Sequence, residues 1–145
     1  MLVAQGDLPA ALAAYQASRA IRERLATADP GNAGWQRDLS VSHNKIGDVL
    51  VDQGDLPAAL AAYQASHAIF ERLATADPGN AGWQRDLALS HGRIGLVFAT
   101  QGERQLALGA FEKGREIIAH LQSRSPDNAV FPNDLAWFDG QIALA

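Results

Sequence analysis

The chain contains no cysteine among its 145 residues. It therefore cannot form a disulfide framework, bind a metal ion through thiolates or use a cysteine nucleophile. These absences exclude the small disulfide-rich proteins and the common thiolate zinc sites, and a redox function is not expected.

The chain also lacks a strong charge of one sign and any long apolar run. Twelve Lys and Arg stand against 16 Asp and Glu, which gives a formal net charge of −4. Nucleic-acid binding needs clustered basic residues, so we expect no nucleic-acid partner. No stretch approaches the roughly 18 apolar residues of a membrane span, and the first residues do not resemble a signal peptide. We therefore expect a cytoplasmic protein without a membrane partner.

What the chain does have is a globular composition and an internal repeat. Hydrophobic residues make up 48% and charged residues 19%, so a core can be buried. Residues 3–50 recur as residues 51–98 with nine differences, and residues 99–145 form a third, more divergent copy. A fixed period predicts stacked units, each too small to bury its apolar face alone. We expect one repeat array over residues 1–145, with units of about 3–50, 51–98 and 99–145, as a fragment of a longer array.

Each copy is predicted to form two helices. The first runs from about Asn32 to Gln53, because Asn32 is a favourable N-cap and apolar residues recur at steps of three and four. Gly54 ends this helix, the second helix starts at Asp55, and residues 77–80 end it and cap the next one. No segment shows strand alternation, so the predicted fold class is all-α. The apolar face of the second helix comprises Leu56, Ala59, Leu60, Tyr63, Ser66, Ile69 and Leu73.

The segment Asn44–Ser66 resembles a tetratricopeptide repeat (TPR). In that family an apolar residue followed by Gly, a Gly-acidic turn, an Ala, an aromatic and a small residue occur at set spacings. The matching residues are Ile46, Gly47, Leu50, Gly54, Asp55, Ala59, Tyr63 and Ser66, and one period later Ile94, Gly95, Phe98, Gly102, Glu103, Ala107, Phe111 and Gly114. The resemblance implies an α-solenoid of stacked antiparallel helix pairs, wound as a right-handed superhelix, whose concave side holds extended peptides.

The repeat of 48 residues is longer than the family unit of about 34. The excess of about seven residues per helix is close to two turns, so each helix can lengthen without rotating its apolar stripe. We therefore expect a long-helix variant of the fold. Gly47 in mid-helix costs about 1 kcal/mol relative to Ala, and we expect it to let the facing backbone of Ala59 or Ala11 approach closely.

No residue cluster favours catalysis or metal binding. His43 and His91 are one period apart, and because neighbouring helices pack about 8–10 Å apart, both imidazoles cannot reach one metal ion at about 2 Å. The glycine-containing stretch 29–38 lacks the Lys-Ser or Lys-Thr of a phosphate-binding loop. We therefore expect no enzyme activity, no metal and no cofactor.

The differences between the first two copies concentrate on one face of the first helix. Five of the nine fall at positions 41, 44, 45, 48 and 52 or their equivalents, which share a helix face. The resemblance implies that this face lines the concave side, although drift at solvent-exposed positions would also produce such differences. Polar members would pair with peptide backbone and carboxylates, and apolar members would add contact area. The expected groove residues are Val41, Asn44, Lys45, Asp48, Asp52, Leu89, Arg93, Leu96 and Trp137.

The predicted function is a protein–protein interaction module that binds a peptide or a partner helix in this groove. The alternative is a structural repeat scaffold that self-assembles. In that case the helix from about Asn128 to Ala145 of one molecule would pack beside the helix that begins at Asp7 of the next, in a weak head-to-tail contact. The carboxylate clamp of some TPR proteins is not expected, because this chain has Asn44, Asp48, Gly92 and Leu96 at the clamp positions.

Overall fold

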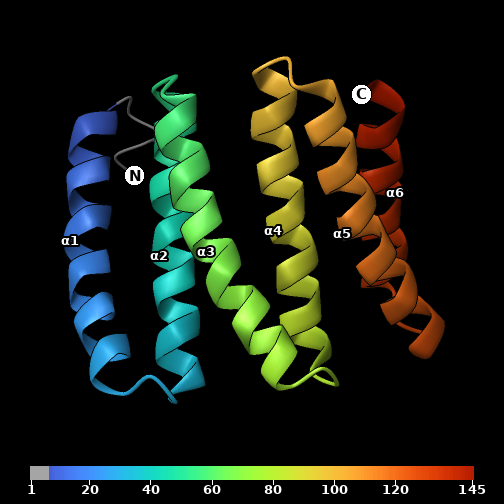
Figure 1. The fold of residues 1–145 in the computed structure, drawn as a ribbon, viewed down its shortest axis with the longest axis horizontal. Coiled ribbons are helices and arrows are strands. Elements are labelled where there is room, and N and C mark those ends of the chain that lie inside the picture. The colour runs from blue at the N-terminus through green and yellow to red at the C-terminus, as the bar shows by residue number, and fades with distance from the viewer. Residues whose placement is uncertain (1–6) are drawn as a thin grey trace. The chain divides into compact units, whose positions relative to one another are not determined.

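The computed structural model describes residues 7–145 and contains six α-helices over this range (Figure 1). No strand occurs among these residues. The described part of the chain is therefore all-α, as predicted, and α1 packs against α2, α4 against α5, and α5 against α6. Residues 3–6 of the first repeat copy, including Ala4, the counterpart of Asp52, lie outside the described residues. The helices are α1 (Leu8–Ala28), α2 (Ala33–Asp52), α3 (Leu56–Ala76), α4 (Ala81–Thr100), α5 (Arg104–Arg124) and α6 (Val130–Leu144).

The helix ends follow the predicted capping residues. Asn32 and Asn80 each accept a hydrogen bond through the side chain from the backbone N–H three residues on, at 3.1 Å. Asp55 does the same at 3.2 Å. Gly54 and Gly102 have φ of +81°, the left-handed conformation that glycine adopts at little cost. The predicted helix from about 32 to 53, and the start of the next at 55, are confirmed.

The third copy begins its first helix differently. Asn128 accepts a hydrogen bond from the N–H of Val130, two residues on rather than three, at 2.9 Å. Gln36 and Gln84 donate their backbone N–H to the carbonyl of the capping Asn at 3.1 Å, but Pro132 stands at this place in the third copy and has no N–H. For this reason α6 starts at Val130 and not directly after Asn128.

The described helices form two compact units, residues 7–69 and 70–145, and the division falls within α3. In the first unit α1 lies beside α2 (Figure 1). The predicted apolar face of the second helix is confirmed at its centre, since Ala59, Tyr63, Ser66 and Ile69 are all buried. The other buried apolar residues of this unit are Ala11, Ala26, Leu39, Ile46 and Val49.

Gly47 makes room for an aromatic ring. A Cβ atom at Gly47 would lie 2.6 Å from Cδ1 of Tyr63, closer than real Cβ contacts come. The nearest neighbour of Gly47 is therefore the Tyr63 ring and not the backbone of Ala59 or Ala11, as the sequence had led us to expect. The Tyr63 ring fills the space because it reaches across from α3 to the α2 backbone, which only a residue without a side chain leaves open.

In the second unit α5 packs against both α4 and α6 (Figure 1). The Phe111 ring lies over Gly95, so the pairing of Gly47 with Tyr63 is repeated. Across this unit Arg85 of α4 donates two hydrogen bonds to Asp134 of α6, at 2.7 and 3.1 Å. The core cluster comprises Ala88, Ala107, Phe111, Ile118, Leu121, Phe131 and Phe138.

None of the helices within residues 7–145 combines the length and the apolar character needed to cross a membrane.

Candidate partner-binding surfaces

The predicted groove residues are divided between the two units. Val41, Asn44, Lys45, Asp48 and Asp52 lie on α2 in the first unit and are called the α2 surface below. Leu89, Arg93 and Leu96 on α4 and Trp137 on α6 lie in the second unit and are called the α4–α6 surface. Each unit therefore carries its own set of these residues.

On the α2 surface, Lys45, Asp48 and Asp52 are exposed and Val41 is half-buried. The ammonium of Lys45 lies 5.7 Å from the centre of the Tyr15 ring, within the range of a cation–π contact. Asp48 accepts a hydrogen bond from the hydroxyl of Tyr63. Both charged side chains are thus held on the aromatic residues of neighbouring helices while their outer faces meet solvent.

Asn44 is buried, with 8% of its surface exposed, and does not face solvent as the sequence suggested. Its Oδ1 atom has no hydrogen-bond partner among residues 7–145. A buried polar atom without a partner costs about 1–3 kcal/mol. Asn44 therefore offers an unused acceptor beneath the exposed part of the α2 surface.

Trp137 is the centre of the α4–α6 surface. Its ring forms T-shaped contacts with the rings of Phe111 and Phe138, with ring centres 5.9 and 5.0 Å apart and interplanar angles of 79° and 84°. It also lies over Gly92, where a Cβ atom would come within 2.9 Å of the indole. Trp137 nevertheless keeps 38% of its surface exposed. The indole is therefore fixed on one side and open on the other.

The α4 members of this surface follow one another at steps of four and three, on one face of the helix. Leu96 is 41% exposed, while Leu89 and Arg93 are half-buried. Arg93 directly follows Gly92, the residue under the Trp137 ring. The surface thus combines an indole, an exposed leucine and a guanidinium.

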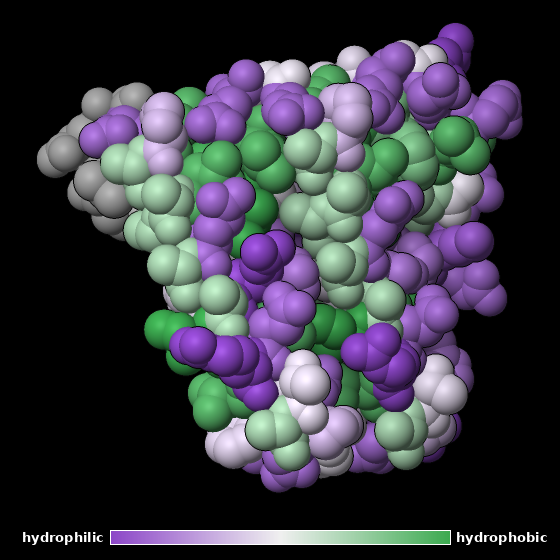
Figure 2. Space-filling view, turned by 60° about the vertical axis from the view of Figure 1, so that its left-hand side comes forward, coloured by the Kyte–Doolittle hydropathy of each residue, from purple (hydrophilic) through white to green (hydrophobic). Residues whose placement is uncertain are grey.

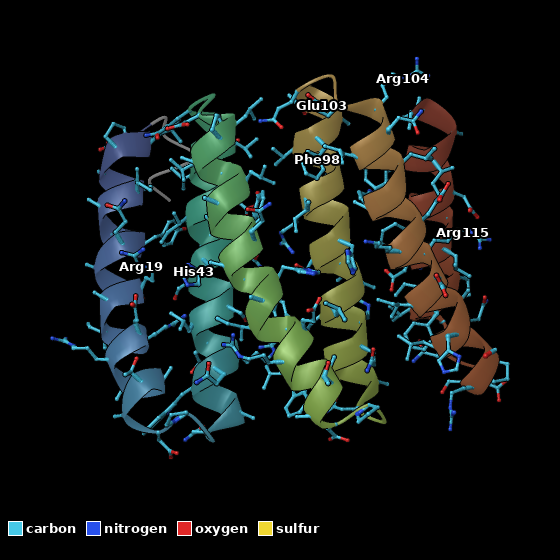
Figure 3. All side chains as sticks on the ribbon, viewed as in Figure 1. Arg19, His43, Phe98, Glu103, Arg104 and Arg115 are labelled. Carbon is cyan, nitrogen blue, oxygen red and sulfur yellow. The ribbon has the colours of Figure 1, made fainter. Side chains whose placement is uncertain are left out.

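His43 belongs to helix packing in the first unit. It lies with Arg19 between α1 and α2 (Figure 3). Burial lowers the pKa of His43 and the charge of Arg19 lowers it further, whereas Glu23, 4.0 Å from Arg19, acts in the opposite direction. The imidazole is therefore neutral at pH 7. Within residues 7–145, no group of three or more His, Asp or Glu side chains is arranged to hold a metal ion.

The second unit replaces this contact with an ion pair. Arg115 and Asp139 occupy the positions equivalent to Arg19 and His43, and the Arg115 Nε lies 2.5 Å from the Asp139 carboxylate. Asp139 of α6 thus carries a negative charge that pairs with Arg115 of α5, whereas the first unit has the imidazole of His43 at the equivalent position.

A hollow of about 1040 Å³ was not anticipated from the sequence. It lies in the second unit, between the start of α4 and the second half of α5. The sequence does mark its wall when the third copy is compared with the first two. The third copy has charged residues on this wall where the other copies have alanine, namely Lys113, Glu116 and Arg124. Comparison of the first two copies alone does not reveal it.

No protein-family model and no curated protein matches this chain. The resemblance to the TPR family rests on the residues quoted for it.

Proposed function

We propose that the chain is a TPR-like protein-interaction module that acts in the cytoplasm and binds a peptide or a partner helix. In this proposal each unit binds through its own surface: the second unit through the α4–α6 surface and the first unit through the α2 surface. The all-α repeat architecture supports this proposal because paired helices in repeat proteins present exposed faces that bind partners.

The single observation that carries the proposal is the state of Trp137. Tryptophan is among the residues that contribute most to protein interfaces, especially where it is rigid before binding. Edge contacts with Phe111 and Phe138 fix the ring, yet 38% of the residue remains exposed. A partner that covers it gains apolar burial without ordering a mobile side chain.

The α2 surface of the first unit offers polar groups of its own to a peptide. Lys45 and Asp48 are exposed and carry opposite charges, so an extended peptide can pair with both. The unpartnered Oδ1 of Asn44 is suited to a backbone N–H of the peptide, provided that the side chain turns outward. Asn44 is therefore a weaker contact in this proposal than the exposed residues.

The proposal is tested with peptides selected from a random library on the purified chain. Fluorescence anisotropy then compares their affinity for wild type, Trp137→Ala and Leu96→Ala. We expect each variant to bind about tenfold or more weakly, corresponding to about 1.4 kcal/mol or more. Leu106→Ala is the matched control, since Leu106 is a 54% exposed leucine of α5 that belongs to neither surface. Selected peptides that bind all variants equally, with unchanged circular dichroism, would refute the proposal.

A second candidate is the self-assembling scaffold, which the exposure of α1 favours. Ile21 and Leu25 of α1 are 52% and 41% exposed, whereas their repeat equivalents Ile69 and Leu73 are 4% and 8% exposed. Figure 2, with the α1 side turned forward, shows hydrophobic side chains interspersed with polar ones. Sedimentation over a concentration series would detect association, and Ile21→Glu with Leu25→Glu should abolish it.

The side chain of Ala143 opposes head-to-tail association in the register of the repeat. Gly47 and Gly95 leave room for the Tyr63 and Phe111 rings, but Ala143 holds the equivalent position in the third copy. Its methyl group would occupy the space that the incoming aromatic ring needs. The repeat frame therefore favours the interaction module over the scaffold.

A further inference from the structure

The hollow of the second unit is separate from the surface proposed above. It is lined by the turn before α4, the first turns of α4 and the face of α5 from Lys113 to Arg124. None of Leu89, Arg93, Leu96 and Trp137 lines it. Its apolar part includes Leu121, which is buried, and Ile117, which is half-buried.

Two of the three charged side chains around the hollow are basic. Lys113 and Arg124 are exposed on its wall, and neither has an ion-pair or hydrogen-bond partner among residues 7–145. Glu116 is the one carboxylate among the lining residues, and the imidazole of His120 adds an N–H group. The chain as a whole has a net charge of −4, so this basic wall is opposite in sign to the rest of the protein.

The start of α4 also favours a negatively charged ligand in the hollow. Ala81, the first residue of α4, lines the hollow, and the first N–H groups of a helix carry its positive dipole end. This end places a partial positive charge opposite the cations of α5.

The charged residues are peculiar to the third copy. Positions 113, 116 and 124 hold Lys, Glu and Arg in α5, but alanine in both of the equivalent helices. Alanine is the best helix former, so helix stability does not call for these replacements. Arg124 also suits the C-terminal end of α5, but Lys113 lies in mid-helix, where the dipole gives no such reason. The equivalent alanines are Ala17, Ala20 and Ala28 in α1, and Ala65, Ala68 and Ala76 in α3.

We infer that this hollow binds an acidic peptide segment. Lys113 and Arg124 pair with carboxylates, and an apolar side chain between them rests on Ile117 and Leu121. Lys113 and Arg124 are 11 positions apart, or about 16 Å along the helix, which an extended chain spans with about five residues. One small anion cannot bridge that distance, whereas a short segment with carboxylates near both ends can.

The probe is a fluorescein-labelled peptide in which glutamates flank two leucines, and its control peptide carries glutamine at each glutamate position. Fluorescence anisotropy at low salt should detect binding of the glutamate peptide and much weaker binding of the glutamine peptide. Lys113→Ala and Arg124→Ala restore the residue of the other copies, and each should weaken binding about tenfold. Glu116→Ala, which also restores that residue, should strengthen it.

Two further variants test whether the probe binds at this hollow and not elsewhere on the protein. Arg72→Ala removes the same charge from an exposed residue of α3 that does not line the hollow, and should leave affinity unchanged. Leu96→Ala alters the α4–α6 surface and should also leave affinity for this probe unchanged. The inference and the proposed function can therefore fail independently.

Three results would overturn the inference. One is wild-type affinity in the double variant Lys113→Ala/Arg124→Ala, and another is equal binding of both peptides. The third is binding of a single-stranded oligonucleotide as tightly as the glutamate peptide, since that would show a general polyanion surface. Should the double variant fail to fold by circular dichroism, Glu116→Ala decides, and an absence of tighter binding there counts against the inference.

Discussion

The ring of Phe138 on α6 occupies the space that a side chain at Gly114 on α5 would need. A Cβ atom at Gly114 would lie 2.5 Å from Cζ of Phe138 and 2.9 Å from the carbonyl oxygen of Ala88. Phe138 is fully buried in the core of the second unit. Where the other copies have two serines, the third copy has a phenylalanine and a glycine. The large Phe138 side chain takes the space that the missing side chain of Gly114 leaves, so the core stays filled. The equivalent residues of the other copies are Ser42 and Ser90 for Phe138, and Ser18 and Ser66 for Gly114.

Gly114→Ser should destabilise the chain by about 2–4 kcal/mol, because neither the ring nor the backbone carbonyl can yield easily. Urea unfolding measures the loss. Gly109→Ser is the control in the same helix, where nothing lies within 4 Å of the added Cβ atom, and it should be nearly neutral. In the double variant with Phe138→Ser the cost should be less than the sum of the single costs. Strict additivity would show that the two positions are not coupled.

Tyr63→Ala should cost about 3–5 kcal/mol, because it removes a ring that is 5% exposed and lies over Gly47. Thermal melting should show a clear fall in Tm. Its neighbour Gln64 is exposed, so Gln64→Ala should melt close to wild type. Similar melting of both variants would mean that the buried face of α3 has been assigned wrongly.

Arg85→Ala should cost about 2 kcal/mol, because it leaves the Asp134 carboxylate, 11% exposed, without its ion-pair partner. The figure is below that of a fully buried pair because the Arg85 side chain is 37% exposed. Arg115→Ala breaks the more exposed pair with Asp139 and should cost less than about 1 kcal/mol. Chemical denaturation of both variants gives the comparison, and equal losses would contradict it.

The free energy of unfolding should fall as the pH drops through about 6.5, because His43 has a lowered pKa in the folded chain. Between the folded and unfolded pKa values the unfolded chain binds more protons, so acid favours unfolding. His43→Gln should reduce this slope between about pH 7.5 and 5.5, as measured by urea unfolding at several pH values. An unchanged slope in His43→Gln would exclude this histidine as the cause.

Much of the local structure could be predicted because it depends on residues close together in the chain. Asn32 and Asn80 cap helices with their own side chains, and Gly54 and Gly102 take a conformation that other residues avoid. The candidate site was harder, since Asn44 lies on the same helix face as Lys45 and Asp48 but is buried. The spacing of residues along a helix shows which side of that helix a residue lies on. Its exposure to solvent depends on how the neighbouring helices pack against that side.

The sequence by itself determined that this protein is a helical repeat, because the 48-residue period, the caps and the apolar stripes are all local or periodic signals. Only the tertiary structure decided what each small residue accommodates. Gly47 faces the Tyr63 ring and Gly114 faces Phe138, and these pairs are 16 and 24 residues apart in the chain. The physical reason is that such contacts depend on how two helices approach each other, and no single helix carries that information. The same approach leaves Trp137 half exposed and opens the hollow beside Lys113 and Arg124.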